Sequence, residues 1–187
     1  MALTILDPKT ALIVIDLQKG MAALSTVPPI DEVVKQASAL ADAFRRHRLP
    51  VVLVNVAGSP AGRKEQLRSQ AEFPAGWTDL LPELNQQPED HTVTKRTPGA
   101  FMNTDLAEYL KNQGVTQVVV TGVSTSSGVE STARQAYEHG FNVTLAVDAM
   151  SDLNPDTHFN SITRIFPKLG ETGTTREIIH LLDKRST

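Results

Sequence analysis

Short apolar runs rich in β-branched residues recur along the 187-residue chain, and they constrain its fold more than any other feature. They occupy residues 11–15, 51–56, 115–120 and 142–147, and the last run alternates more with polar residues. Near-continuous apolar runs are typical of strands that are covered on both faces, as in a parallel sheet. Segments with helical spacing lie between the runs, so the order of elements predicts a doubly wound α/β sheet.

The connecting segments carry apolar stripes at intervals of three and four residues. The clearest stripe runs over residues 33–44, and the basic residues 45–48 in its closing turns suit the negative end of a helix. Weaker stripes end near Gly114 and at Gly140, and we expect Gly140 to be a C-terminal glycine cap. The last helix is predicted to begin with a capping box that joins Thr174 to Glu177.

Composition and charge exclude several classes of function. The chain has no cysteine, which rules out disulfides, thiolate metal sites and a cysteine nucleophile. The net charge is −3, with 18 basic and 21 acidic residues mixed along the chain, so we expect no nucleic-acid partner. The five histidines show no ligand spacing, and we therefore expect no metal and no cofactor.

The length and the apolar runs also set expectations about organisation and location. Residues 1–187 are predicted to form a single domain. The apolar runs are too short to span a bilayer, and the first eight residues lack the pattern of a signal peptide, so we expect a cytoplasmic protein without membrane contact. One long connection, residues 57–90, is rich in proline, glycine and glutamine, with Phe73 and Trp77 as its aromatic residues, and we interpret it as a partly ordered lid.

Polar residues at the carboxyl ends of the predicted strands are candidates for a site, because ligands of open parallel sheets bind beyond those ends. Asp16 follows five apolar residues, Asn55 ends the second run, and Lys95 follows a short segment at 92–94. Asp16 either caps the next turn or is an acid/base group that faces Lys95. Lys95 stands beside Arg96, which is also typical of a solvated surface pair, and the Thr-Pro-Gly turn after it would hold it in place.

The segment 122–128 is bounded by glycines, is rich in hydroxyl groups and directly precedes a predicted helix. It matches neither the Walker phosphate loop nor the dinucleotide-binding glycine motif. Such a turn either presents free backbone N–H groups to an anion or oxyanion, or is only a tight connection between strand and helix with no binding role. No histidine is positioned by the sequence to activate Ser124, Ser126 or Ser127, so a serine-hydrolase triad has little support.

Taken together, these segments resemble the isochorismatase-like hydrolase superfamily, also called the cysteine hydrolases, from about Thr10 to Leu182. The motifs that carry the resemblance, in this order, are ALIVIDLQ at 11–18, KRTPGAF at 95–101, VTGVST at 120–125, VESTARQA at 129–136, GFNV at 140–143 and DA at 148–149. The resemblance implies a Rossmann-like three-layer α/β/α fold with a mostly parallel sheet of about six strands. It also implies a homo-oligomer, a dimer or higher.

By motif matching, Asp16 and Lys95 take the positions of the aspartate and lysine of the superfamily's site. The cysteine position falls on Gly128, where no acyl intermediate can form. Isochorismatases resemble this sequence in that glycine, and they hydrolyse a vinyl ether without a covalent enzyme intermediate. Nicotinamidases of the superfamily bind a metal after the second strand, where this chain reads Asn-Val-Ala-Gly at 55–58, so no metal is expected.

The sequence therefore predicts a metal-independent hydrolase of a small carboxylated substrate such as a vinyl ether. Asp16 would be the general acid, with Lys95 as its partner, and burial would have to offset the preference of the ammonium for an ionised carboxylate. The resemblance implies a cis peptide between Val123 and Ser124, which would aim the N–H groups of Ser124 and Gly128 at the substrate. Residues predicted by position to contact the substrate are Gln18, Asn55, Trp77, Phe101 and Thr125.

Two alternatives come from the missing thiol. One is an amidase that uses the hydroxyl of Ser127 or Thr125 as its nucleophile. The other is a pseudoenzyme that binds a metabolite without turnover.

Overall fold

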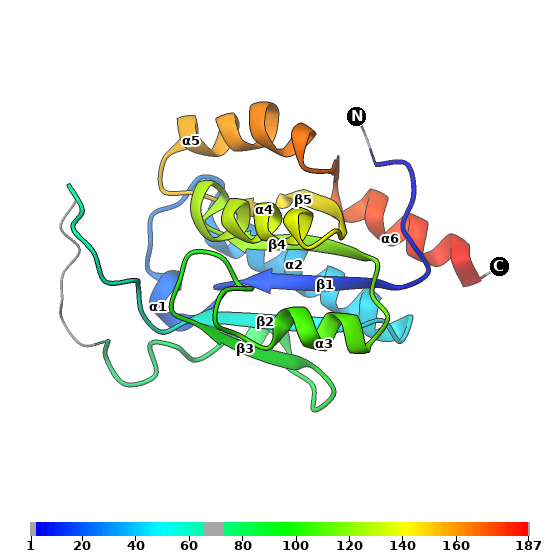
Figure 1. The fold of residues 1–187 in the computed structure, drawn as a ribbon, viewed down its shortest axis with the longest axis horizontal. Coiled ribbons are helices and arrows are strands. Elements are labelled where there is room, and N and C mark those ends of the chain that lie inside the picture. The colour runs from blue at the N-terminus through cyan, green and yellow to red at the C-terminus, as the bar shows by residue number, and fades with distance from the viewer. Residues whose placement is uncertain (1–2, 66–72, 187) are drawn as a thin grey trace.

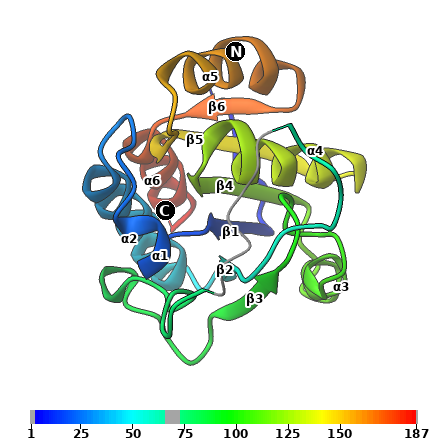
Figure 2. The same ribbon diagram turned by 90° about the vertical axis from the view of Figure 1, so that its left-hand side faces the viewer.

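The computed structural model describes residues 3–65 and 73–186, and its centre is a sheet of six strands. The strand order is β3-β2-β1-β4-β5-β6, and every neighbouring pair is parallel (Figures 1 and 2). The strands are β1 (Thr10–Ile15), β2 (Val51–Val56), β3 (His91–Lys95), β4 (Gln117–Val123), β5 (Asn142–Ser151) and β6 (Glu171–Gly173).

Helices cover both faces of this sheet, and the fold is the three-layer α/β architecture that the sequence predicts. Helices α2 (Ile30–Arg46) and α6 (Thr175–Asp183) cover one face, and α3 (Leu106–Asn112) and α4 (Glu130–Glu138) cover the other (Figure 2). The shorter helices are α1 (Lys19–Ala22) and α5 (Pro155–Asn160). Short helical turns lie at η1 (Pro82–Leu84), η2 (Thr125–Val129), η3 (Ser161–Ile165), η4 (Phe166–Lys168) and η5 (Lys184–Ser186).

Alternate residues of β1, β2, β4 and β5 enter two separate cores, which explains why these strand sequences read as largely continuous apolar runs. In β1, Leu12 and Val14 pack in the core under α2 and α6, whereas Ile13 and Ile15 pack in the core under α3 and α4. All six residues of β1 are buried. The central position of β1 therefore accounts for the strength of its sequence signal.

The predicted strand and helix positions agree with the structure, but several element ends differ. The run at 51–56 is β2 itself, whereas β4 begins two residues after the predicted start at 115 and both β4 and β5 extend further along the chain. The capping box of α6 is confirmed: Glu177 N–H donates to Thr174 Oγ1 at 3.3 Å, and Thr174 N–H donates to the Glu177 carboxylate at 2.7 Å. Gly140 follows α4 with φ +85°, which confirms the predicted glycine cap.

The sheet order places a switch point between β1 and β4. From β1 the chain adds β2 and β3 on one side, and it then returns to add β4, β5 and β6 on the other. The carboxyl ends of β1 and β4 thus flank the crevice in which ligands of open α/β sheets bind.

The long connection 57–90 is tied to the end of β1 over part of its length. The N–H groups of Lys19 and Gly20 donate to the carbonyl oxygens of Asp79 and Trp77, and Leu81 N–H donates to Leu17 O. Residues 66–72 of the predicted lid lie outside the described residues, so a lid stays a prediction. Within the described part of the chain, no helix is both long enough and apolar enough to span a bilayer.

Candidate active site

Asp16 stands directly after β1, at the switch point of the sheet. Its φ of +54° is left-handed, a region that aspartate enters more readily than most residues. Its N–H donates to Val54 O of β2 at 2.9 Å, so the neighbouring strand fixes its backbone. Asp16 is only 4% exposed. The chain thus places a carboxyl group inside the protein at the end of its central strand.

Lys95, the last residue of β3, is buried beside Asp16 and has partners for all three of its ammonium protons. Its Nζ lies 2.8 Å from Asp16 Oδ2, 2.7 Å from Pro98 O and 3.3 Å from Thr97 O. The solvated surface pair considered for Lys95 is therefore wrong, and the turn after it holds the ammonium in place as predicted. An ammonium with three acceptors is rigidly positioned.

Burial and the ammonium of Lys95 shift the pKa of Asp16 in opposite directions. Burial raises the pKa of Asp16 to about 6, and the attraction and hydrogen bond of Lys95 offset only part of that rise. Asp16 Oδ2 contacts Lys95, whereas Oδ1 is buried and has no hydrogen-bond partner among the residues that the structure describes. Desolvation therefore outweighs the ion pair, and Oδ1 is the carboxyl oxygen left without a hydrogen bond in the described residues.

Gly128, in η2, lies against the same carboxyl group. A Cβ atom at this position would lie 3.3 Å from Asp16 Oδ2, 3.0 Å from Ile15 Cγ2 and 3.1 Å from Val123 O. These contacts are tighter than ordinary van der Waals contacts with a carbon atom. The position that motif matching assigns to the superfamily cysteine is therefore beside Asp16, and its tight surroundings favour a residue without a side chain.

The turn from β4 into η2 is held by hydrogen bonds of its own backbone and by Asp152, which directly follows β5. The peptide between Val123 and Ser124 is cis, as the resemblance implies, and Ser124 O accepts the N–H groups of Ser127 and Val129 at 3.1 Å. Ser126 N–H donates to Asp152 Oδ2 at 2.6 Å. One N–H of this turn is thus taken by the protein's own carboxylate, and an anion-binding role for the N–H groups of Ser124 and Gly128 stays a prediction.

Two of the predicted substrate contacts make hydrogen bonds to the backbone. The Gln18 side chain is fully buried; its Oε1 accepts Val56 N–H at 2.7 Å, and its Nε2 donates to Val56 O and Trp77 O. These bonds give Gln18 a structural role between β2 and the segment at Trp77. Asn55 Nδ2 donates to Thr78 O at 3.0 Å, and its Oδ1 is buried without a hydrogen-bond partner in the described residues.

The two predicted aromatic contacts pack against other residues. The Trp77 ring lies on Gly20, where a Cβ would overlap it, and stacks on Phe73 with ring centroids 3.9 Å apart. Phe101 is buried, with its ring centroid 5.1 Å from that of His139 and 6.0 Å from that of Phe141. The packing partners of both rings are thus known, and substrate contact by either ring stays a prediction.

Thr125 has a partner that the sequence did not reveal. Its buried hydroxyl lies 2.8 Å from Nδ1 of His158, a residue of α5. Burial lowers the pKa of His158, although Asp152 acts to raise it. No spacing rule links residues 33 positions apart, so only the packing of α5 on η2 shows this pair.

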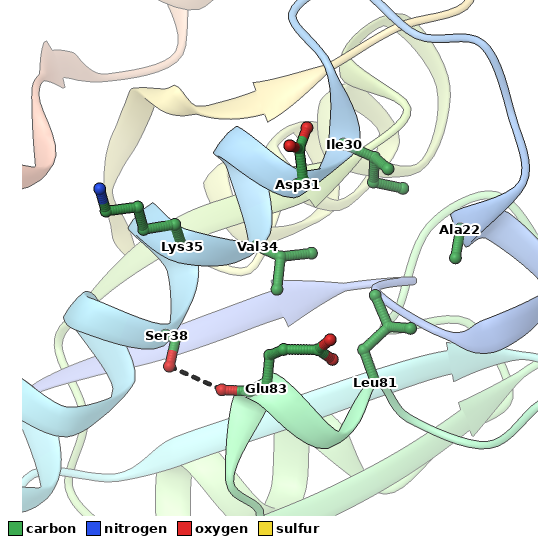
Figure 3. Close-up of a pocket in the computed structure, with 8 residues that line it drawn as sticks. All are labelled: Ala22, Ile30, Asp31, Val34, Lys35, Ser38, Leu81 and Glu83. Carbon is green, nitrogen blue, oxygen red and sulfur yellow. Dashed lines mark hydrogen bonds between the residues drawn. The ribbon is translucent and has the colours of Figure 1, made fainter.

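Two surface hollows lie away from Asp16. One of about 510 Å³ lies between α2 and the segment at Leu81, and Figure 3 shows Ser38 there donating to Glu83 O at 2.7 Å. The other, of about 660 Å³, includes His47 and Leu181. The lining of each contains none of the predicted site residues, and we place the candidate site at Asp16 because buried charge and an unpartnered polar atom meet there.

Among the described residues, no group of three or more His, Asp or Glu side chains is arranged to hold a metal ion.

Comparison with known proteins identifies the relatives of this chain. The isochorismatase domain family matches residues 10–177. The chain is 39% identical over 181 residues to an uncharacterized isochorismatase family protein, YwoC, of Bacillus subtilis, covering 91% of this chain and 93% of that protein. It is 40% identical to a second uncharacterized family protein, YecD, of Escherichia coli O157:H7, covering 92% and 96%. The solved structure of an isochorismatase family protein from Burkholderia thailandensis superposes with a TM-score of 0.92 at 39% identity, covering 96% of this chain and 98% of that one.

Proposed function

The chain belongs to the isochorismatase family and is a hydrolase, and from that premise we propose that it hydrolyses a small carboxylated substrate, such as a vinyl ether, by acid catalysis without a covalent or metal-bound intermediate. The observation that carries this proposal is the carboxyl group of Asp16, which is buried, paired with Lys95 through Oδ2 and unpartnered at Oδ1 in the described residues. Family membership also argues against the non-catalytic binding protein considered from the sequence.

The proposed reaction begins with the protonated form of Asp16. Asp16 transfers its proton to the terminal carbon of the enol ether, which leaves an oxocarbenium ion at the adjacent carbon and a carboxylate on Asp16. Lys95, 2.8 Å from Oδ2, stabilises that carboxylate. Water adds to the oxocarbenium ion and returns a proton to Asp16, and the hemiketal then collapses to a keto acid and an alcohol.

The glycine at position 128 supports a route without a covalent intermediate. A side chain there would begin 3.3 Å from Asp16 Oδ2 and would occupy the space beside the acid. Glycine offers no side-chain nucleophile at this position, so the proposed route uses water as the nucleophile. The chain also contains no thiol to replace the superfamily nucleophile.

The direct test is release of pyruvate from isochorismate by the wild-type protein, Asp16→Asn and Asp31→Asn. Asp31 lies on α2 outside the candidate site and serves as the matched control. We expect wild type and Asp31→Asn to turn over and Asp16→Asn to lose at least about a hundredfold in rate, the range of general acid catalysis. Full activity of Asp16→Asn, or an inactive wild type with isochorismate and with a panel of other enolpyruvyl ethers, would overturn the proposal.

The contact between Thr125 and His158 favours a second candidate, an amidase with a hydroxyl nucleophile. His158 Nδ1 lies 2.8 Å from the Thr125 hydroxyl, and burial lowers the pKa of His158, so the neutral imidazole is available as a base. Incubation with a panel of small amides, followed by mass spectrometry, would find an acyl group on Thr125 or Ser127 if this function is correct, and none if the acid mechanism is.

We also propose a homo-oligomer, a dimer or higher. Family resemblance supports it, as do the apolar side chains of Leu153 and Phe159, which are 56% and 67% exposed. Light scattering of the purified protein would give at least twice the monomer mass of 20.3 kDa. The monomer mass at micromolar concentration would contradict this proposal.

A further inference from the structure

We propose that Thr132 is a positioning residue of the site: its hydroxyl joins the turn that holds Lys95 to the turn that holds Gly128, and so sets how Lys95 meets Asp16. Thr132 lies on α4 and is completely buried. Its Oγ1 donates to Gly128 O at 2.7 Å and accepts Ala100 N–H at 3.1 Å. The importance of this residue for catalysis depends on the proposed function, whereas its effect on Asp16 does not.

These contacts form a closed path around the carboxyl group. Asp16 Oδ2 contacts Lys95 Nζ, which donates to Pro98 O. Two residues after Pro98, the N–H of Ala100 reaches Thr132, and Thr132 reaches Gly128 O. Gly128 in turn lies beside Asp16 Oδ2. One hydroxyl oxygen therefore connects both flanks of the candidate site.

Among the described residues, Thr132 is the side chain that bonds to both Ala100 and Gly128. Gln135, one turn later on α4, accepts Phe101 N–H at 3.0 Å and so supports the Lys95 turn, but within the described residues it makes no hydrogen bond to Gly128. Ala100 and Gly128 are both buried, so loss of the Thr132 hydroxyl would leave a buried N–H and a buried carbonyl without that partner. The backbone would have to shift to recover these bonds.

Such a backbone shift would change the environment of Asp16 by moving the groups that hold Lys95. Lys95 is the charged group that acts on Asp16, and it lowers the pKa of that carboxyl against the effect of burial. If the turn at 97–100 moves, the carbonyl acceptors of Lys95 move with it, and the ion pair weakens. Asp16 then keeps its proton to a higher pH than in the wild-type protein.

The test compares Thr132→Val, which removes the hydroxyl at nearly constant volume, with Thr132→Ser, which keeps it. Thr163→Val is the matched control, because the Thr163 hydroxyl also donates to the carbonyl four residues earlier, Phe159 O, at 2.7 Å. The Asp16 carboxyl is titrated by ¹³C NMR, with Asp16→Asn used to assign its signal. We expect the Asp16 pKa to rise by about half a unit or more in Thr132→Val and to stay at the wild-type value in the other two.

Kinetics supply a second readout that depends on the proposed function. Thr132→Val is expected to lower kcat about tenfold at the wild-type pH optimum, the effect of losing one well-placed hydrogen bond, with a smaller change in KM. Thr132→Ser should restore kcat. If Thr132→Val does not fold, Thr132→Ala is titrated in its place.

Three results would overturn the inference: an unchanged Asp16 pKa in folded Thr132→Val, equal shifts in Thr132→Val and Thr132→Ser, or an equal shift in Thr163→Val. Turnover that persists in Asp16→Asn would instead refute the proposed function. In that case the NMR titration still decides whether Thr132 positions the pair.

Discussion

At the scale of single residues, the site depends on a carboxyl group whose environment favours the neutral form. Asp16 is buried at the end of β1, and burial raises its pKa to about 6 despite the ammonium of Lys95 at 2.8 Å. A group of this kind holds its proton up to about pH 6, well above the range of an ordinary aspartate, and a general acid must be protonated at the pH at which it acts.

The raised pKa of Asp16 predicts how folding stability depends on pH. In the unfolded chain the carboxyl ionises near pH 3.8, and in the folded protein it ionises near pH 6. The stabilisation that the protonated carboxyl gives to the folded state is therefore fully present below pH 3.8 and is lost as the pH rises through 6. The free energy of unfolding falls by about 3 kcal/mol in total over this range. Urea denaturation at pH 4 to 7 should show this loss in wild type but not in Asp16→Asn, and parallel curves for the two proteins would contradict it.

The tight packing around Gly128 predicts that a side chain at this position would lower both the stability of the fold and the rate of turnover. In Gly128→Ala the new methyl group would meet Ile15 Cγ2 at 3.0 Å and Asp16 Oδ2 at 3.3 Å. We expect a loss of about 1–3 kcal/mol in unfolding free energy, as for other overpacked sites, together with lower turnover. Gly58→Ala is the control, because the atoms nearest its methyl would be those of the Arg96 side chain, at 3.4 Å. Equal stability losses in both variants would show that crowding at Asp16 is not the cause.

At the scale of elements, local signals explain what the sequence predicted well. The strands appear as apolar runs because both faces of β1 and its neighbours are buried, and the capping box and Gly140 mark helix ends through hydrogen bonds within a few residues. The ends of β4 and β5 were not predictable in this way. Their pairing shifts register between Val120 and Gly122, and only the neighbouring strand sets that shift.

The capping box of α6 gives a prediction confined to one element. Thr174→Ala removes the side-chain acceptor of Glu177 N–H, and we expect it to lower the unfolding free energy by about 1 kcal/mol. Since α6 packs on the sheet face opposite α4, turnover at saturating substrate should be unchanged. Chemical denaturation and a standard activity assay check both points, and a large loss of turnover would show that α6 is coupled to the site.

At the scale of the whole molecule, the site exists because the sheet order brings distant segments together. The ends of β1, β3 and β4 supply Asp16, Lys95 and the η2 turn, and the sequence predicted this meeting because ligands bind at the carboxyl ends of parallel strands. It did not predict Asp152, His158 or Thr132 as supports, because their partners depend on packing between elements. Nor did it predict that Gln18 bonds to backbone groups, since a position after a strand does not fix where a side chain points.

The central claim is that Asp16 acts while it holds a proton, and the pH dependence of kcat/KM tests it most directly. We expect kcat/KM to fall as the pH rises through about 6, by about tenfold per pH unit above that value. In Lys95→Met the same fall should move to higher pH, because Lys95 lowers the pKa of Asp16. An activity that instead rises with pH through 6 would make ionised Asp16 the active form and would contradict the acid mechanism.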